Sequence, residues 1–250
     1  MHAVHDPPLE HLSPYVVATS AVAVHLDLAP LGQLITPEQH FDPLRRASAP
    51  FLRRVEQLDA AEYAPRGMAM PRWALYDCAE LPGVITGLAH RTSEGLLPLS
   101  MLIAVPMLGE RRWLIYTIAS PRAQLRFATL ALGLALVRAR EIDATLQWSS
   151  PELPVYAHFA PLDVRAARLP AHDVPATCVL RFQVDPDRLD QAIAGADADW
   201  PGAERLDVHD PAVLGRLQSG VEAGLRVQIV GHPAREGEAL IVPFVIGSPP

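Results

Sequence analysis

The sequence predicts an α/β (α+β) protein with a mixed, mainly antiparallel sheet flanked by helices. Three observations support this class. Half of the 250 residues are hydrophobic, which is enough for a large buried core. Strand-like runs joined by short turns fill the middle of the chain, as is typical of antiparallel neighbours. Helix-like runs precede and follow these strands, so the two kinds of element alternate.

The first third of the chain predicts a strand, a helix and a hairpin. Residues 15–28 are rich in β-branched side chains and predict a strand. Residues 41–62 carry apolar side chains near helical spacing and predict one helix kinked at Pro50, or two short helices. The run "RWALYDCAELPGVITGLAH" predicts a strand, a turn at Pro82 and Gly83, and a second strand.

The central third continues with strands around one strongly apolar helix. The runs "LPLSMLIAVPM" and "RRWLIYTIAS" flank the short connection "LGE" and predict a further hairpin. Residues 122–141 are apolar on nearly every side, as expected of a helix packed between layers. The run "ATLQWSS" predicts a strand, "PELPVYAHFAPLDV" a turn or short helix, and "VPATCVLRFQVD" another strand.

The last quarter is acidic and predicts two helices and a terminal hairpin. From Asp185 onward the chain has eleven acidic residues against five arginines. Two Asp-Pro pairs, which begin at Asp185 and Asp210, each predict an N-cap followed by proline in the first helical turn. The runs "LRVQIVG" and "ALIVPFVIG" predict the hairpin. We therefore expect three parts: an N-terminal leader, strand and helix start (1–49), a central domain (50–184) and an acidic α/β extension (185–250).

Composition excludes several classes of function. The sequence contains no lysine and no asparagine, so a Schiff-base lysine, a P-loop lysine and an N-glycosylation sequon are all absent. A net charge of −7 without a long basic run argues against a nucleic-acid partner. No secretory signal and no apolar run of membrane-spanning length is evident, so we expect a soluble, cytoplasmic protein that has no membrane partner. Cys78 and Cys178 lie in apolar runs and are expected to be buried thiols.

The order of elements resembles the GNAT-type acyl-CoA N-acyltransferases. The resemblance rests on a hairpin that contains "LPGVITGLA", further strands, a charged turn that opens the helix in "SPRAQLRFATLALGLALVRA", another strand and the segment "VYAHFAP". It covers about half of the chain, residues 50–185. It implies transfer of an acyl group from a thioester or another activated carrier to a small-molecule amine, with coenzyme A or acyl-CoA as the expected cofactor.

The same resemblance implies candidate site residues. The pyrophosphate turn of such enzymes maps onto "QLRFAT", where Gln124 matches and the two glycine positions hold Phe127 and Thr129. Arg122 and Arg126 are the basic side chains beside this turn, where a guanidinium can pair with a phosphate. Tyr156 is the candidate general acid for the departing thiolate. Glu80 is assigned as the base, among the carboxylates near turns, which are Asp77, Glu80 and Glu110.

Bland alternatives stay open for each of these assignments. Tyr156 can instead be a tyrosine packed on the core. The carboxylates can be solvated turn residues, and the two arginines can cap the turn over an acidic neighbour. The histidines of the N-terminus (His2, His5 and His11) predict a mobile leader, and no metal site is expected. His158 and the pair His172 and Asp173 predict either a basic group near a pocket or loop residues.

Two further functions compete with acyl transfer. Because the glycines of the phosphate turn are missing, the chain could be a non-catalytic GNAT-like subunit that binds or assembles with a protein partner or a second copy of itself. It could also bind a small molecule in a cleft between the central sheet and the extension. Neither a Gly-x-Ser-x-Gly elbow nor a dinucleotide fingerprint is present, so serine hydrolysis and dinucleotide binding have no support.

Overall fold

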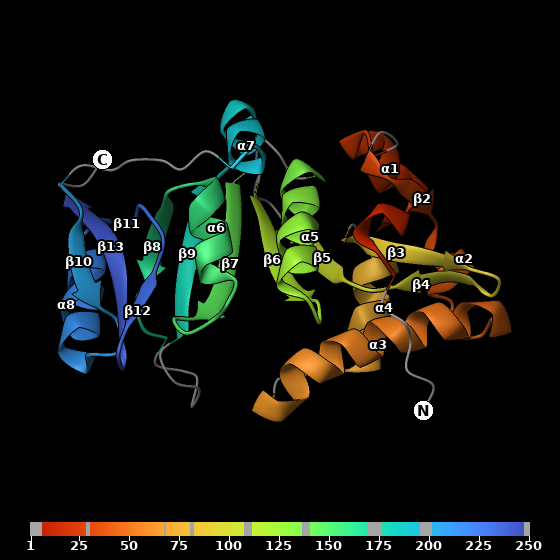
Figure 1. Ribbon diagram of the computed structural model, residues 1–250, viewed down its shortest axis with the longest axis horizontal. Coiled ribbons are helices and arrows are strands. Elements are labelled where there is room, and N and C mark those ends of the chain that lie inside the picture. The colour runs from red at the N-terminus through yellow and green to blue at the C-terminus, as the bar shows by residue number, and fades with distance from the viewer. Residues whose placement is uncertain are drawn as a thin grey trace. The chain divides into compact units, whose positions relative to one another are not determined.

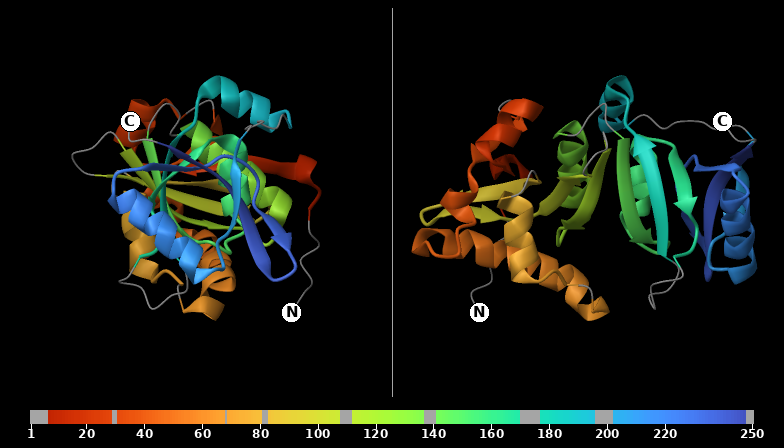
Figure 2. Two further views of the ribbon diagram at one scale, coloured as in Figure 1. Left: turned by 90° about the vertical axis from the view of Figure 1, so that its left-hand side faces the viewer. Right: turned by 180° about the vertical axis from the view of Figure 1, so that it is seen from behind.

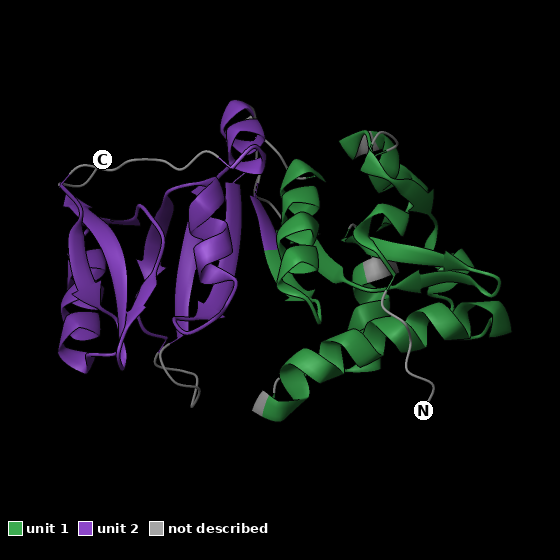
Figure 3. Ribbon diagram, viewed as in Figure 1, with its two compact units in different colours: residues 1–110, 115–137 green, residues 111–114, 138–250 purple. Residues whose placement is uncertain are grey.

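The computed structural model describes residues 7–28, 31–67, 69–80, 83–107, 112–136, 141–169, 177–195 and 202–247. Its internal contacts divide the chain into two compact units (Figure 3). Unit 1 comprises residues 1–110 and 115–137, and unit 2 comprises residues 111–114 and 138–250. In both units the strands form mainly antiparallel sheet with helices packed against it (Figure 1), which confirms the predicted fold class.

The described residues of unit 1 form six strands, the last of which begins in unit 2. The strands are β1 (Leu12–Val17), β2 (Gln33–Ile35), β3 (Val84–Thr92), β4 (Gly95–Pro98), β5 (Met101–Pro106) and β6 (Arg112–Ala119). The α-helices are α1 (Ser20–Leu26), α2 (Pro37–His40), α3 (Ala49–Tyr63), α4 (Arg72–Glu80) and α5 (Ala123–Leu136). Short 3-10 helices cover Leu9–His11, Arg46–Ser48 and Ala64–Arg66.

The strand order in unit 1 is β2-β1-β3-β5-β6, with β4 paired to β3. Strand β1 pairs in parallel with β2 and antiparallel with β3, and β3 pairs antiparallel with β4 and β5. Neighbouring residues of β3 and β5 point to opposite faces of this sheet. Ile85 and Ile103 share one face, and Thr86 and Leu102 share the other. Both faces are buried, which is why these strands read as continuous apolar runs.

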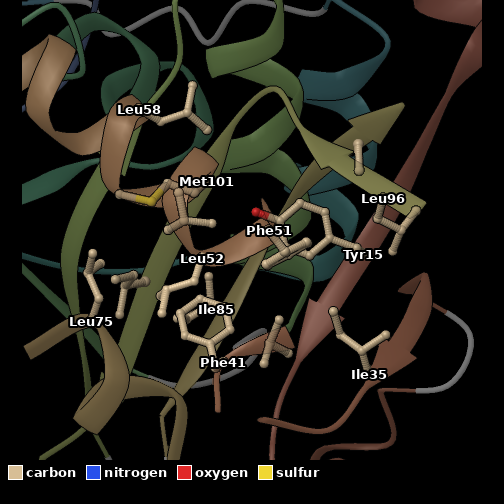
Figure 4. Close-up of a cluster of buried hydrophobic side chains, with 14 of the residues drawn as sticks. Tyr15, Ile35, Phe41, Phe51, Leu52, Leu58, Leu75, Ile85, Leu96 and Met101 are labelled. Atoms are coloured by element: carbon tan, nitrogen blue, oxygen red, sulfur yellow. The ribbon is translucent and has the colours of Figure 1, made fainter. Parts of the chain in front are cut away.

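Helices α3 and α4 gather on one side of the unit 1 strands (Figures 1 and 2). Their apolar residues meet Tyr15, Ile85 and Met101 in one buried cluster (Figure 4). Phe51 lies at the centre of this cluster, with ring centroids 5.4 Å from Tyr15 and 5.7 Å from Phe41. On the opposite face α5 lies close to β5, since a Cβ on Gly133 would lie only 2.7 Å from the Leu102 side chain.

Two sequence predictions in unit 1 are wrong. Residues 72–80 form helix α4 instead of a strand, because Leu75 and Cys78 pack at helical spacing against the α3 cluster. In residues 15–28 the strand ends at Val17, and helix α1 follows. The Thr19 side chain accepts a hydrogen bond from the Val22 amide and so caps this helix. The predicted helix over 41–62 begins only at Ala49, with Pro50 in its first turn.

Where the structure describes unit 2, the chain forms seven strands besides the start of β6. The strands are β7 (Glu141–Gln147), β8 (Leu162–Ala166), β9 (Thr177–Gln183), β10 (Glu204–Asp207), β11 (Arg226–Ile229), β12 (Ala234–Glu236) and β13 (Ala239–Gly247). The helices are α6 (Leu153–Phe159), α7 (Pro186–Ile193) and α8 (Pro211–Glu222). The strand order is β10-β13-β11-β8-β9-β7, with β12 paired to β13.

The two faces of the unit 2 sheet differ in polarity. One face carries buried apolar side chains, among them Phe182, on which Tyr156 packs, and Phe244, on which Trp148 packs. The other face carries a row of charges. There Asp143 accepts hydrogen bonds from the guanidinium groups of Arg112 (3.0 Å) and Arg181 (2.7 Å). In the same row of that face, Arg226 pairs with Asp163 at 3.1 Å. This alternation of apolar and polar side chains is what a half-covered antiparallel sheet requires.

Several predictions in unit 2 are confirmed. Asp185 caps α7 by accepting from the amides of Asp187 and Arg188, and Asp210 caps α8 by accepting from the amide of Ala212. The terminal hairpin forms between β11 and β13, which pair antiparallel. The "PELPVYAHFAPLDV" segment contains α6, as one of its two predictions allowed, but its last residues enter strand β8. Strand β10 was not predicted. The "LGE" connection lies outside the described residues.

Candidate functional site

The junction of β6 and α5 brings together the residues predicted to hold a phosphate. Ser120 follows the last residue of β6, and its hydroxyl donates to the Arg122 carbonyl (3.1 Å) and accepts from the Arg122 amide (3.3 Å). Helix α5 then begins, and the Arg126 amide donates to the Arg122 carbonyl at 3.0 Å. Amides in the first turn of an α-helix need acceptors outside the helix. This end of α5 is therefore electropositive.

The two arginines at this junction are held by other parts of unit 1. The Arg126 guanidinium donates to the Glu62 carboxylate at 2.6 Å and to the Ser120 carbonyl at 3.2 Å. Both side chains of this ion pair are largely buried, with 12% and 17% of their surface exposed. Arg122 donates to the Pro7 carbonyl at 3.4 Å. Gln124 is exposed on the first turn of α5.

The two positions that the resemblance assigns to glycine differ in burial. Phe127 is half-buried. Thr129 is fully buried, and its hydroxyl donates to the Ser100 hydroxyl at 2.6 Å. The Thr129 side chain therefore points into the sheet and does not fill the turn in front of the helix.

Ser100 is a buried polar residue that the sequence did not single out. Its hydroxyl also accepts from the Leu88 amide at 3.0 Å, and its carbonyl accepts from the Tyr15 hydroxyl at 2.9 Å. The amides of Leu99 and Ser100 both donate to the Leu88 carbonyl, which marks a β-bulge between β4 and β5. Burial raises the pKa of Tyr15, so its hydroxyl stays protonated as a donor.

Tyr156 lies on α6 in unit 2, and only 3% of its surface is exposed. Its ring lies 5.4 Å from that of Phe182 at an interplanar angle of 51°. Upstream of it, the Ser150 hydroxyl donates to the Glu152 carboxylate, and both residues are buried. The structure therefore places Tyr156 against the core, and the aromatic contact accounts for its orientation.

His158 follows Tyr156 by half a helical turn and contacts a second histidine. Its Nε2 lies 2.9 Å from the Ala192 carbonyl, and its Nδ1 lies 3.2 Å from Nε2 of His232. Since a carbonyl only accepts, Nε2 of His158 carries a proton. The Arg188 guanidinium donates to the His158 carbonyl at 2.8 Å, so α6 and α7 are joined at this point.

The remaining sequence candidates are scattered. Glu80 is the last residue of α4 in unit 1, and its side chain lies outside the described part of the structure. Asp77 is exposed on the same helix. Other candidates fall outside the described residues, namely Glu110, His2, His5, His172 and Asp173. Glu80, Arg122, Gln124 and Arg126 thus share unit 1, and Tyr156 belongs to unit 2.

The described ranges contain no group of three or more histidine, cysteine or acidic side chains placed to hold a metal ion. In the same ranges no helix is both long and apolar enough to cross a bilayer. Both cysteines are free thiols, with Cys178 buried as predicted and Cys78 half-buried.

Comparison with solved structures yields distant similarity, of which one example is described below. The chain matches no family of known sequences and no curated protein. Among solved structures it is similar to a CoA-dependent acyl-homoserine lactone synthase, BjaI, in complex with SAM and isopentyl-CoA. The sequence identity is 12% and the TM-score is 0.43, over 79% of this chain and 96% of that chain. Function has to be argued from the chain's own residues.

Proposed function

We propose that the protein is a divergent GNAT-like N-acyltransferase, which moves an acyl group from a thioester such as acyl-CoA to an amine. The observation that carries the proposal is the junction of β6 and α5. There a strand ends, Ser120 closes the turn, and a 14-residue helix begins beside Arg122. The positive end of a helix and a guanidinium group both favour a bound phosphate.

The side chains at this junction fit a phosphate-bearing cofactor in part. Gln124 is exposed and Thr129 points away, so the backbone of the first turn is approachable from the Gln124 side. Arg126 shares its charge with Glu62. We therefore assign contact with the phosphates to Arg122, Gln124 and the first-turn amides, and a supporting electrostatic role to Arg126.

The chemistry needs one proton acceptor and one proton donor. The amine nitrogen forms a bond to the thioester carbonyl carbon, and the carbon–sulfur bond breaks. We assign the Glu80 carboxylate to take the proton that the amine loses, and solvent to donate the proton that the departing sulfur gains. When bound, acyl-CoA would supply the activated thioester, and coenzyme A would be the thiol that leaves.

Thermal unfolding with coenzyme A tests the binding step. A ligand that binds only the folded state at about 100 times its Kd adds roughly 2.7 kcal/mol of stability and raises Tm by several degrees. We expect this rise for the wild-type chain and a smaller one for Arg122→Gln. Arg205→Gln is the matched control, because Arg205 pairs with Glu236 on the exposed surface of unit 2. Absence of any rise at millimolar coenzyme A would refute the cofactor assignment.

Turnover tests the catalytic step. Release of free thiol from acyl-CoA in the presence of an amine panel is the readout, and the lysine-free chain has no lysine side chain to act as a competing amine. Glu80→Gln should lower kcat while the Tm rise with coenzyme A is kept. Equal kcat in this variant would exclude Glu80 as the base.

A second candidate function is a non-catalytic binding or assembly subunit. The observation that favours it is the buried ion pair between Arg126 and Glu62, in which a carboxylate of the chain already compensates the guanidinium. Glu62→Gln distinguishes the two functions. If the junction binds phosphate, this variant should bind coenzyme A more tightly than the wild type. If the chain is a binding subunit, neither form should respond to coenzyme A.

A further inference from the structure

A cavity of about 340 Å³ in unit 2 lies outside the proposed acyl-transfer site. It opens between the second half of α8 and the strands β10, β11 and β13. Ligand pockets span about 300–1,000 Å³, so this one suits an occupant of amino-acid size. Its lining residues are Glu204, Arg216, Leu217, Gly220, Leu225, Val227 and Ile246.

The floor of this cavity is apolar and its rim is partly apolar too. Leu217 and Val227 are 1% and 2% exposed and form the floor. Leu225 and Ile246 are 39% and 36% exposed and are among the most exposed large hydrophobic residues described. Val227 and Ile246 are opposite each other in the β11–β13 ladder, so they present one continuous surface toward α8. An apolar side chain that entered here would remove this surface from water.

The cavity wall also carries one charge of each sign. Glu204 begins β10, opposite Phe244 of β13, and so lies on the same face of the sheet as Ile246. Arg216 lies on α8 one helical turn before Gly220. Both charged residues are exposed. A fatty acid could pair with Arg216 but would be repelled by Glu204, and a simple hydrophobic amine could pair with Glu204 but would be repelled by Arg216. A zwitterion satisfies both groups.

Gly220 leaves room for such an occupant. A glycine inside a helix lowers the stability of the helix relative to alanine. At this position a Cβ would lie 3.6 Å from the Leu225 side chain and 3.9 Å from that of Val227, which is ordinary contact. No steric demand therefore requires glycine, and its effect is to keep the helix wall of the cavity open.

From these observations we propose that the cavity binds a free hydrophobic α-amino acid. The ammonium group pairs with Glu204, the carboxylate pairs with Arg216, and the side chain packs on Leu217, Val227 and Ile246. This site is separate from the residues assigned to acyl transfer, and its occupancy does not depend on that assignment.

Ligand-observed NMR titration of the full-length chain tests the ligand class. We expect saturable binding of L-leucine, and binding weaker by at least about tenfold for N-acetyl-leucine, which lacks the ammonium, and for leucinamide, which lacks the carboxylate. Glycine should also bind at least about tenfold more weakly, because it lacks the apolar side chain. Equal binding of leucine and either blocked analogue would overturn the zwitterion assignment. No saturable binding of leucine up to about 10 mM would overturn the site itself.

Variants of α8 test the location. Gly220→Leu fills the cavity from the helix and should abolish leucine binding. Gly215→Leu is the matched control, because a Cβ at Gly215 meets nothing within 4 Å. Arg216→Gln and Glu204→Gln should each weaken binding about tenfold. If Gly220→Leu does not fold, as judged by circular dichroism, Gly220→Ala provides the test, with partial loss expected. Unchanged binding in a folded Gly220 variant contradicts the proposal.

Discussion

At the scale of single residues, Gly87 is determined by what surrounds it. A Cβ at this position would lie 2.1 Å from the Ser100 carbonyl oxygen and 3.0 Å from the Tyr15 hydroxyl. The carbonyl belongs to the bulge between β4 and β5 and accepts from Tyr15, so it cannot move without breaking that bond. The sequence showed a glycine in an aliphatic run, but the partner that requires it is 13 positions away.

Gly87→Ala should therefore lower the free energy of unfolding by about 2–3 kcal/mol, since the added methyl overpacks a rigid backbone contact. Urea denaturation measures the change. Gly215→Ala is the control: it makes the same substitution in open space inside α8 and should raise stability by up to about 1 kcal/mol. Equal effects of the two changes would mean that the bulge can relax around the methyl group.

The surroundings of Asp59 determine the pH at which its carboxyl group ionises. It is 2% exposed, and its carboxylate accepts from the Met70 amide at 2.5 Å. Burial raises its pKa, and the amide bond offsets part of that rise. The folded state therefore keeps its proton to a higher pH than the unfolded state, whose pKa is near 3.8. The contribution of Asp59 to stability decreases as pH rises from 3.8 through the folded pKa.

Asp59→Asn keeps an oxygen for the Met70 amide and removes the charge. We expect the variant to gain stability relative to the wild type as pH increases from about 3.8, with a constant difference once Asp59 is ionised in the folded state. Urea unfolding of both proteins between pH 3.5 and 7 gives this difference. If the stability difference between the two proteins did not change with pH, the pKa of Asp59 would be the same in the folded and unfolded states.

At the scale of elements, the helix starts predicted from capping residues are confirmed, and the strand predicted from the apolar spacing of residues 72–80 is wrong. The helix starts at Asp185 and Asp210 are predictable because an Asp-Pro pair indicates a helix start from the local sequence alone. Residues 72–80 were read as a strand because Leu75 and Cys78 lie in a short apolar run whose period is ambiguous. Packing against α3 resolves that ambiguity. This packing involves residues distant in the chain, so the local sequence carries no sign of it.

The buried ion pair of Glu62 and Arg126 connects the end of α3 to the start of α5. Removing one partner leaves the other charge in a site that is largely closed to water. Glu62→Gln should therefore cost about 1–3 kcal/mol of unfolding free energy in urea. Glu236→Gln breaks the pair of Glu236 with Arg205, whose side chains are 59% and 56% exposed, and should cost less than about 1 kcal/mol. Similar costs for the two substitutions would show that the Glu62–Arg126 pair is as accessible to water as the Arg205–Glu236 pair.

At the scale of the whole molecule, the order of elements is largely predictable from the sequence, and the surroundings of the candidate site residues are not. Strand–helix order follows from local periodicity, so α5 was expected where it lies. The partners of the site residues were not predictable, because Glu62 is 64 positions from Arg126. The acidic tail was expected as an extension, and its strand β11 pairs antiparallel with β8. Long-range pairings of this kind leave no local signal.

Strand β6 has a consequence for how the chain can be divided. Its first residues belong to unit 2 and its later ones to unit 1, so neither unit is one continuous stretch of polypeptide. A gene fragment that begins at codon 138 encodes Asp143 and Arg181 but omits Arg112, one of the two guanidinium groups on that carboxylate. In such a fragment the Asp143 carboxylate, on β7, lacks one of its two guanidinium partners. A fragment that begins at Arg112 would keep all three residues of the cluster.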